Sequence, residues 1–148
     1  NNVTLSDGYH PPFGAYNQHD GLVYSIIPFS YTEYGLFSFS PTSGEVKQLF
    51  TKPKQQLDGI GICEGVILPD GKTLIFQFGG DTDNLIAMDI TTGNVTFTTN
   101  GFFGPFALSP LHPNKLIALQ NKHGKGFNLL LLDPLTGEQT VLGGANAT

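Results

Sequence analysis

Three turns of one kind recur along the chain, and their spacing constrains the fold more than any other feature of the sequence. Each turn follows a short apolar run, contains a glycine, and is followed by a strand-like run. The glycines lie about 45 residues apart, a period typical of repeated supersecondary units. A chain of 148 residues therefore has room for three such units. The turns are Ser40–Glu45, Asp89–Asn94 and Asp133–Glu138.

The first and third units align without a gap at an offset of 93 positions. Pro12–Ala15 then pairs with Pro105–Leu108, and His19 pairs with His112. A single offset that holds over turn and core positions alike indicates a genuine repeat. The matching histidines therefore indicate a shared role in a turn, and we do not expect a metal site there.

Each unit is predicted to form four short strands. Aromatic and β-branched runs are bounded by Gly, Pro, Asn and Asp, and no segment keeps a helical period. The turn glycines supply the positive φ angles that tight hairpins require. The predicted fold class is all-β, with four-stranded antiparallel sheets over residues 12–50, 63–98 and 105–142. In the third unit the expected strands are Phe106–Ser109, Leu116–Gln120, Asn128–Leu132 and Gln139–Leu142.

Two segments of the middle unit resemble the blades of a known class of repeat protein. Leu68–Leu74 has the sequence LPDGKTL and Met88–Gly93 has the sequence MDITTG. These resemble the turns of β-propellers of the YVTN, WD-repeat or quinoprotein-like type. The resemblance covers roughly residues 12–142 and implies a propeller architecture without choosing one family. The chain has no Trp, so neither a Trp-Asp signature nor a quinoprotein Trp motif is present.

Three blades are too few for a closed propeller, which usually has four to eight. An open stack of three leaves two apolar faces without a neighbour, a feature of interfaces. We therefore expect the chain to associate with copies of itself or to complete a larger ring with further blades. The alternative fold is a β-sandwich that uses similar hairpins.

Composition excludes several classes of function. The chain has a net charge of −5 and its seven basic residues are all Lys, so a nucleic-acid partner is not expected. No apolar window is long enough to cross a membrane. Neither a phosphate loop, a serine elbow nor a Cys/His metal spacing occurs, so no cofactor or metal is expected. The lone Cys63 is expected to pack as a small apolar residue.

The leading functional hypothesis is a non-enzymatic module for binding or assembly. Two alternatives remain open: a fragment of a propeller hydrolase, lyase or oxidoreductase with its catalysis in other blades, and a carbohydrate-binding lectin. In propellers, ligands usually meet the loops that join the second and third strands and successive blades. These loops collect aromatic and charged side chains that suit a glycan, a peptide or a cation, although solvated loop tips are the simpler interpretation. The candidates are Tyr31, Glu33, Tyr34, Asp58, Asp81, Asp83, Asn84, Phe102, Phe103, Lys122, His123 and Lys125.

Three Asn-x-Thr sequons, at Asn2, Asn94 and Asn146, are a mild excess over chance. Asn94 belongs to one of the repeated turns, where a glycan can be accommodated. Together with sparse charge, 13% of residues, the sequons favour an extracellular or cell-surface protein.

Overall fold

The structure is a computed structural model that describes residues 14–28, 33–53, 61–79, 84–99, 103–122 and 124–146. All regular elements within these ranges are β-strands, and they form three four-stranded sheets. In each sheet every strand pairs antiparallel with the strand that follows it in the chain. The all-β prediction is thus confirmed.

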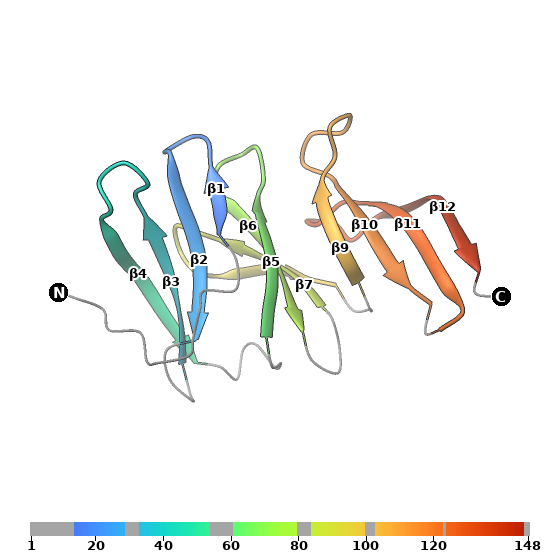
Figure 1. Ribbon diagram of the computed structural model, residues 1–148, viewed down its shortest axis with the longest axis horizontal. Helices are drawn as coiled ribbons and strands as arrows, with labels where there is room; N and C mark the ends of the chain where they lie inside the picture. Colours follow the sequence, from blue (N-terminus) through green and yellow to red (C-terminus); the bar gives the residue numbers. More distant parts are fainter. Residues whose placement is uncertain are drawn as a thin grey trace.

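The sheets follow one another along the chain (Figure 1). The first sheet contains β1 (Ala15–Asn17), β2 (Leu22–Pro28), β3 (Glu33–Phe39) and β4 (Val46–Pro53). The second contains β5 (Gly61–Ile67), β6 (Thr73–Gly79), β7 (Asn84–Asp89) and β8 (Val95–Thr98). The third contains β9 (Phe103–Leu108), β10 (Leu116–Asn121), β11 (Gly126–Leu132) and β12 (Gln139–Asn146).

The second sheet lies between the other two and is buried on both faces (Figure 1). Successive side chains of a strand point to opposite faces. In β6, Leu74 and Phe76 accordingly face the first sheet, while Ile75 faces the third. All three are 0% exposed. This explains why the centre of β6, Leu74–Phe76, is an apolar run without alternation, as expected for a sheet covered on both sides.

Two hydrophobic clusters fill the spaces between sheets. The first joins Ile26 and Leu36 of the first sheet to Phe76 and Met88 of the second. The second cluster joins β6 and β7 to the third sheet, where Leu116 and Leu132 are fully buried. Each inter-sheet space is therefore a separate core, and the second sheet contributes to both.

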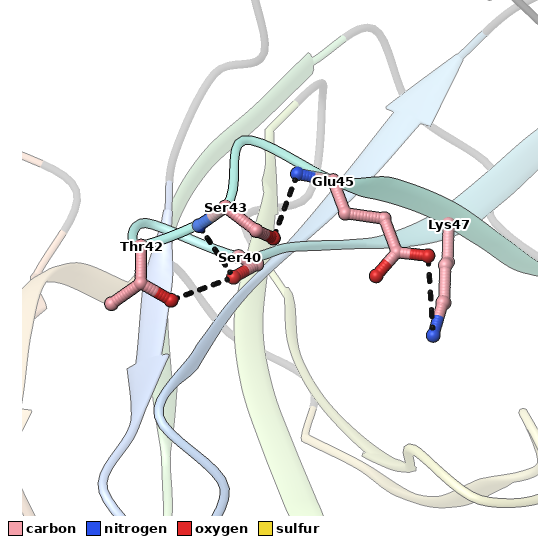
Figure 2. A network of polar contacts seen from close by, with 5 residues as sticks. All are labelled: Ser40, Thr42, Ser43, Glu45 and Lys47. Atoms are coloured by element: carbon pink, nitrogen blue, oxygen red, sulfur yellow. Dashed lines mark hydrogen bonds and ion pairs between the residues drawn. The ribbon is translucent and has the colours of Figure 1, made fainter.

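The repeated turns close the third and fourth strands of every sheet. In the first sheet Gly44 donates its backbone N–H to the Ser40 carbonyl at 2.8 Å and has φ +74°. Figure 2 shows how Ser40 Oγ also accepts from the Ser43 amide at 3.2 Å, while Glu45 pairs with Lys47 at 3.5 Å. In the second and third sheets an aspartate replaces Ser40. Its carboxylate accepts the corresponding amide bonds, at Asp89 and Asp133.

An aromatic ring from each of the first two sheets covers the turn glycine of the next sheet. A Cβ built on Gly93 would lie 2.5 Å from Phe50 Cε2, and one built on Gly137 would lie 2.7 Å from Phe97 Cζ. Phe50 belongs to β4 and Phe97 to β8, the last strands of their sheets. Only glycine leaves room for these rings, so the turns are both hairpin closures and inter-sheet contacts.

A second contact between the first and second sheets involves the turn that joins β1 to β2, and this contact is polar. His19 Nε2 donates to the Pro69 carbonyl at 2.5 Å, and its ring lies against Gly71. Asn17 Nδ2 donates to the Gly71 carbonyl at 3.0 Å. The predicted turn role of His19 is therefore an inter-sheet contact.

Candidate interaction surface

Tyr34 was predicted to face a ligand from a loop, but its side chain is buried in the structure. It lies in β3 within the first hydrophobic cluster and is 2% exposed. Burial raises the pKa of its hydroxyl to about 12. Within the described ranges this hydroxyl has no hydrogen-bond partner. The sequence placed Tyr34 in a loop because the polar residues before it obscured the start of the strand.

The other predicted ligand residues are not brought together in the described part of the chain. Glu33 is exposed at the start of β3, and Lys122 follows β10 and donates to Asn146 Oδ1 at 3.4 Å. The ends of β2, β6 and β10 point to the same edge, the lower one in Figure 1. Lys125 is exposed, and the side chains of Asn84 and Phe103 are not described. Outside the described residues lie Tyr31, Asp58, Asp81, Asp83, Phe102 and His123.

The described residues contain no group of three His, Cys, Asp or Glu side chains that could hold a metal ion. His112 is exposed in the turn before β10, the position that matches His19. Cys63 lies in β5, and the placement of its side chain is not described. No helix in the described ranges is long and apolar enough to span a membrane.

A different surface lies on the side of the third sheet that points away from the second sheet, and it contains none of the predicted loop residues. Pairing of Ile117 with Leu131 and of Leu119 with Leu129 places these four side chains on one face. We call this the outer face of the third sheet. Together with Pro105 and Ala107, three of these residues line a shallow apolar groove of about 230 Å³ on this face. The outer face consists of Ala107, Ile117, Leu119, Leu129 and Leu131.

In the second sheet the corresponding face is covered by a neighbouring sheet. Ile75, Leu85 and Ala87 occupy the same register positions there and are at most 1% exposed because the third sheet covers them. In the third sheet Ile117, Leu119 and Leu129 remain partly exposed and Ala107 is exposed, whereas Leu131 is already buried at 8% exposure. The outer face therefore has the composition of a sheet face that receives another sheet.

The far side of the first sheet is different. Ser25 pairs with Phe37, and both lie on the face opposite to the first hydrophobic cluster. They are 1% exposed, and Ile27 on the same face is 2% exposed. The exposed apolar residues on this far side, Tyr16 at 60% and Val46 at 46%, lie in one row at its end. Among the described residues the two ends of the stack therefore differ, because the outer face of the third sheet is partly exposed at its centre.

A signal for the outer face was present in the sequence. Leu129–Leu132 is an unbroken run of four leucines, and Leu116–Leu119 is also entirely apolar. A strand with one solvated face alternates apolar and polar residues, whereas a strand covered on both faces does not. Together with the three-unit count, these runs identify which strands carry the unpartnered face.

Comparison with known proteins addresses the architecture. No family model and no curated protein sequence matches the chain. Several solved structures match the chain in fold. TolB from Acinetobacter baumannii matches with a TM-score of 0.61 at 20% identity, over 88% of this chain and 31% of TolB. A chain of the nidogen/laminin complex matches with a TM-score of 0.62 at 13% identity, over 89% of this chain and 47% of that one.

The chain has a β-propeller-like fold. A putative 6-phosphogluconolactonase from Bacteroides uniformis is similar in the same way, with a TM-score of 0.58 at 16% identity. This chain spans less than half the length of each of these structures. At such identities the likeness extends to the fold alone.

Proposed function

We propose that this chain is a non-enzymatic β-propeller module for binding and assembly. In its working state another β-sheet covers the outer face of the third sheet, whether from a copy of the chain or from further blades of a larger ring. The observation that supports this proposal is the equivalence between the outer face and the buried Ile75, Leu85 and Ala87 of the second sheet. The greater length of the similar structures also fits a ring with more blades.

Covering the outer face is energetically favourable. Full burial of a leucine or isoleucine side chain contributes about 1.5–3 kcal/mol relative to full exposure. Ile117, Leu119 and Leu129 are only partly exposed, so each has a fraction of this free energy to gain. Contiguous apolar surface of this kind marks interaction sites in soluble proteins.

The experiment is to measure the mass of the isolated native particle and to footprint its apolar side chains with a carbene reagent. We expect a mass above the 15.9 kDa of one chain and little labelling of Ile117, Leu119 and Leu129. Leu142, 52% exposed on β12, serves as the internal reference for labelled leucine. A compact monomer whose outer face is labelled like Leu142 would contradict the proposal.

We also propose that the chain belongs to a secreted or cell-surface protein and carries a glycan at Asn94. This residue is exposed in the turn between β7 and β8. The hydroxyl of Thr96, the third residue of its sequon, donates to the Ala87 carbonyl at 3.2 Å. Because this bond occupies the hydroxyl in the folded chain, the glycan would be added before the sheet closes. Asn146 is exposed at the end of β12, and Asn2 lies outside the described residues.

Expression through a secretory pathway tests this second proposal. We expect a mass decrease on treatment with an N-glycosidase, and loss of the Asn94-containing glycopeptide in Asn94→Gln. Thr96→Ser is the matched control, because it preserves the sequon and the hydroxyl. An unmodified Asn94 in a correctly secreted wild-type chain would rule out the modification.

The enzyme-fragment and lectin alternatives remain predictions. The first places its chemistry in blades outside this chain. The second depends on loop residues such as Tyr31 that lie outside the described ranges.

A further inference from the structure

We propose that two copies of this chain pair through the outer faces of their third sheets, around a two-fold axis. The proposal rests on the assembly function above and names the sheet that covers the outer face. That sheet could come from a second copy of the chain or from a further propeller blade, and we favour the second copy.

The first argument is the difference between the two ends of the stack. A head-to-tail assembly would place the outer face of one copy on the far side of the first sheet of the next. There, Ser25, Ile27 and Phe37 are already at most 2% exposed. The centre of that side is thus already covered, although Tyr16 and Val46 at its end are 60% and 46% exposed. On a second copy, the sheet face whose central apolar residues are still partly exposed is again the outer face. An interface in which one patch meets itself is isologous, and it closes with two-fold symmetry.

The second argument is a missing aromatic residue. β4, β8 and β12 each contain a register shift, and the first residue paired after it is Phe50, Phe97 and Gly143 respectively. The two phenylalanines cover the turn glycine of the next sheet, whereas a Cβ on Gly143 would meet no atom of the described residues within 4 Å. The third sheet thus lacks the ring that joins successive sheets of this chain. A further blade docked as the second sheet docks on the first could not form this contact between an aromatic ring and a turn glycine. Pairing around a two-fold axis does not depend on that contact.

The third argument is charge. The outer face consists of Ala, Ile and Leu side chains without a charged member. The chain as a whole carries a net charge of −5. Two copies therefore approach with least repulsion through a face that excludes the charges, and a partner of opposite charge gains nothing there.

The size of the face sets the expected strength. Six residues of β10 span about 20 Å, and strands lie about 4.8 Å apart, so the three strands that carry the outer face present roughly 300 Å² on each copy. This is less than half of the roughly 800 Å² per partner found in stable complexes. We therefore expect a reversible dimer that dissociates on dilution.

Sedimentation equilibrium of the full chain over a wide concentration range tests the pairing. We expect the mass to rise from 15.9 kDa toward twice that value. Ala107→Asp places a charge on a position that is already exposed, and Leu129→Asp places one at the centre of the face. Both variants should dissociate at least tenfold more readily than wild type.

Leu49→Asp is the matched control, because Leu49 is 42% exposed on β4 of the first sheet. It should dimerise like wild type. Circular dichroism of each variant separates loss of pairing from loss of folding, and Ala107→Asp decides the result if Leu129→Asp fails to fold. Undiminished dimerisation of a folded Ala107→Asp would overturn the proposal.

Cross-linking distinguishes the two-fold pair from a head-to-tail arrangement. Sheets packed face to face lie about 10 Å apart, beyond the reach of a disulfide, so a short bis-maleimide is the reagent. In a Cys63→Ser background, chains that carry Leu119→Cys should cross-link to one another. Chains that carry Val46→Cys should not, alone or mixed with Leu119→Cys chains, although Val46 pairs with Phe39 on the far side of the first sheet and is 46% exposed. Cross-links found only in the mixture would show head-to-tail contact and overturn the two-fold arrangement.

The result also separates this inference from the assembly function. If the isolated chain stays monomeric at high concentration while the native particle is larger with a protected outer face, the two-fold pair is wrong and the assembly function stands. If the native particle is itself a monomer with an accessible outer face, both proposals are wrong.

Discussion

The ring of Phe97 lies against Gly137, so closely that a Cβ on this glycine would be 2.7 Å from Phe97 Cζ. The contact joins the last strand of the second sheet to a turn of the third, as Phe50 and Gly93 join the first sheet to the second. Gly44 occupies the same turn position in the first sheet, where a Cβ would meet no atom from the described part of the chain within 4 Å. The chain therefore contains its own control for the energetic value of this contact.

Gly137→Ala should destabilise the protein more than Gly44→Ala. Both glycines have positive φ, +77° and +74°, and alanine in this region costs about 1–2 kcal/mol. Only Gly137→Ala also forces Phe97 to move, which adds about 1–3 kcal/mol of overpacking. Urea unfolding of the two variants measures the difference. Equal losses would show that the aromatic contact contributes nothing.

Tyr34→Phe and Tyr24→Phe should have opposite effects. The Tyr34 hydroxyl is buried without a hydrogen-bond partner in the described residues, so its removal should stabilise the protein by about 1 kcal/mol. The Tyr24 hydroxyl donates to Asp20 Oδ2 at 2.7 Å, a bond to a charged group worth about 1.5–3 kcal/mol. The free energy of unfolding of each variant decides, and a loss in Tyr34→Phe would reveal an undetected partner.

Stability should fall in acid because of the turn aspartate Asp89. Hydrogen bonds from the Thr91 hydroxyl and amide hold the pKa of Asp89 below its ordinary value of 3.8. A carboxyl with a lowered folded-state pKa stabilises the protein above its unfolded pKa, and this contribution is lost as the pH falls through the folded value. Unfolding measured from pH 6 down to pH 2 should therefore show a decline below about pH 4. Asp89→Asn should have a shallower decline, and an unchanged slope would contradict this assignment.

The alkaline limit should come from the buried tyrosines. Burial raises the pKa of Tyr24, with a smaller contribution from its bond to Asp20, and that of Tyr34, both from 10.0 to about 12. A group with a raised folded-state pKa stabilises the protein fully below its unfolded value and loses that contribution as the pH rises through the folded one. Stability should therefore decline between pH 10 and pH 12. Ultraviolet titration should show two tyrosines that ionise only near pH 12, and their ionisation near pH 10 in the folded protein would be inconsistent with burial.

His19→Ala should weaken the contact between the first and second sheets, while His112→Ala should not affect stability. His19 loses its bond to the Pro69 carbonyl, about 1 kcal/mol, whereas His112 is exposed at the matching position of the third sheet. Thermal unfolding of the two variants is the measurement. Equal effects would mean that the histidines act only within their own turns.

The repeat and the fold class were predictable from sequence because they depend on local chemistry. Turn glycines with positive φ and apolar runs of strand length specify the hairpins at Gly44, Gly93 and Gly137 without reference to distant residues. The shared turn position of His19 and His112 was predictable from the same offset.

The inter-sheet contacts were not predictable in this way. Nothing local to Phe50 indicates that its ring covers Gly93, because the two belong to different sheets. Tyr34 was misplaced for a related reason: its burial depends on the second sheet packing over β3. The outer face of the third sheet was predictable only in part, because the apolar runs Leu116–Leu119 and Leu129–Leu132 mark its strands, whereas strand pairing determines which of their side chains share the face.

The middle position of the second sheet has a consequence for folding. Its strands contribute to two cores, so its loss would remove both at once, whereas either end sheet can separate at the cost of only one. In stacked repeats, stability is approximately a sum of unit and nearest-neighbour terms. The chain should therefore open from its ends, and amide hydrogens of β6 and β7 should exchange last. Coverage of the outer face would give the third sheet a second neighbour and extend the same protection to it.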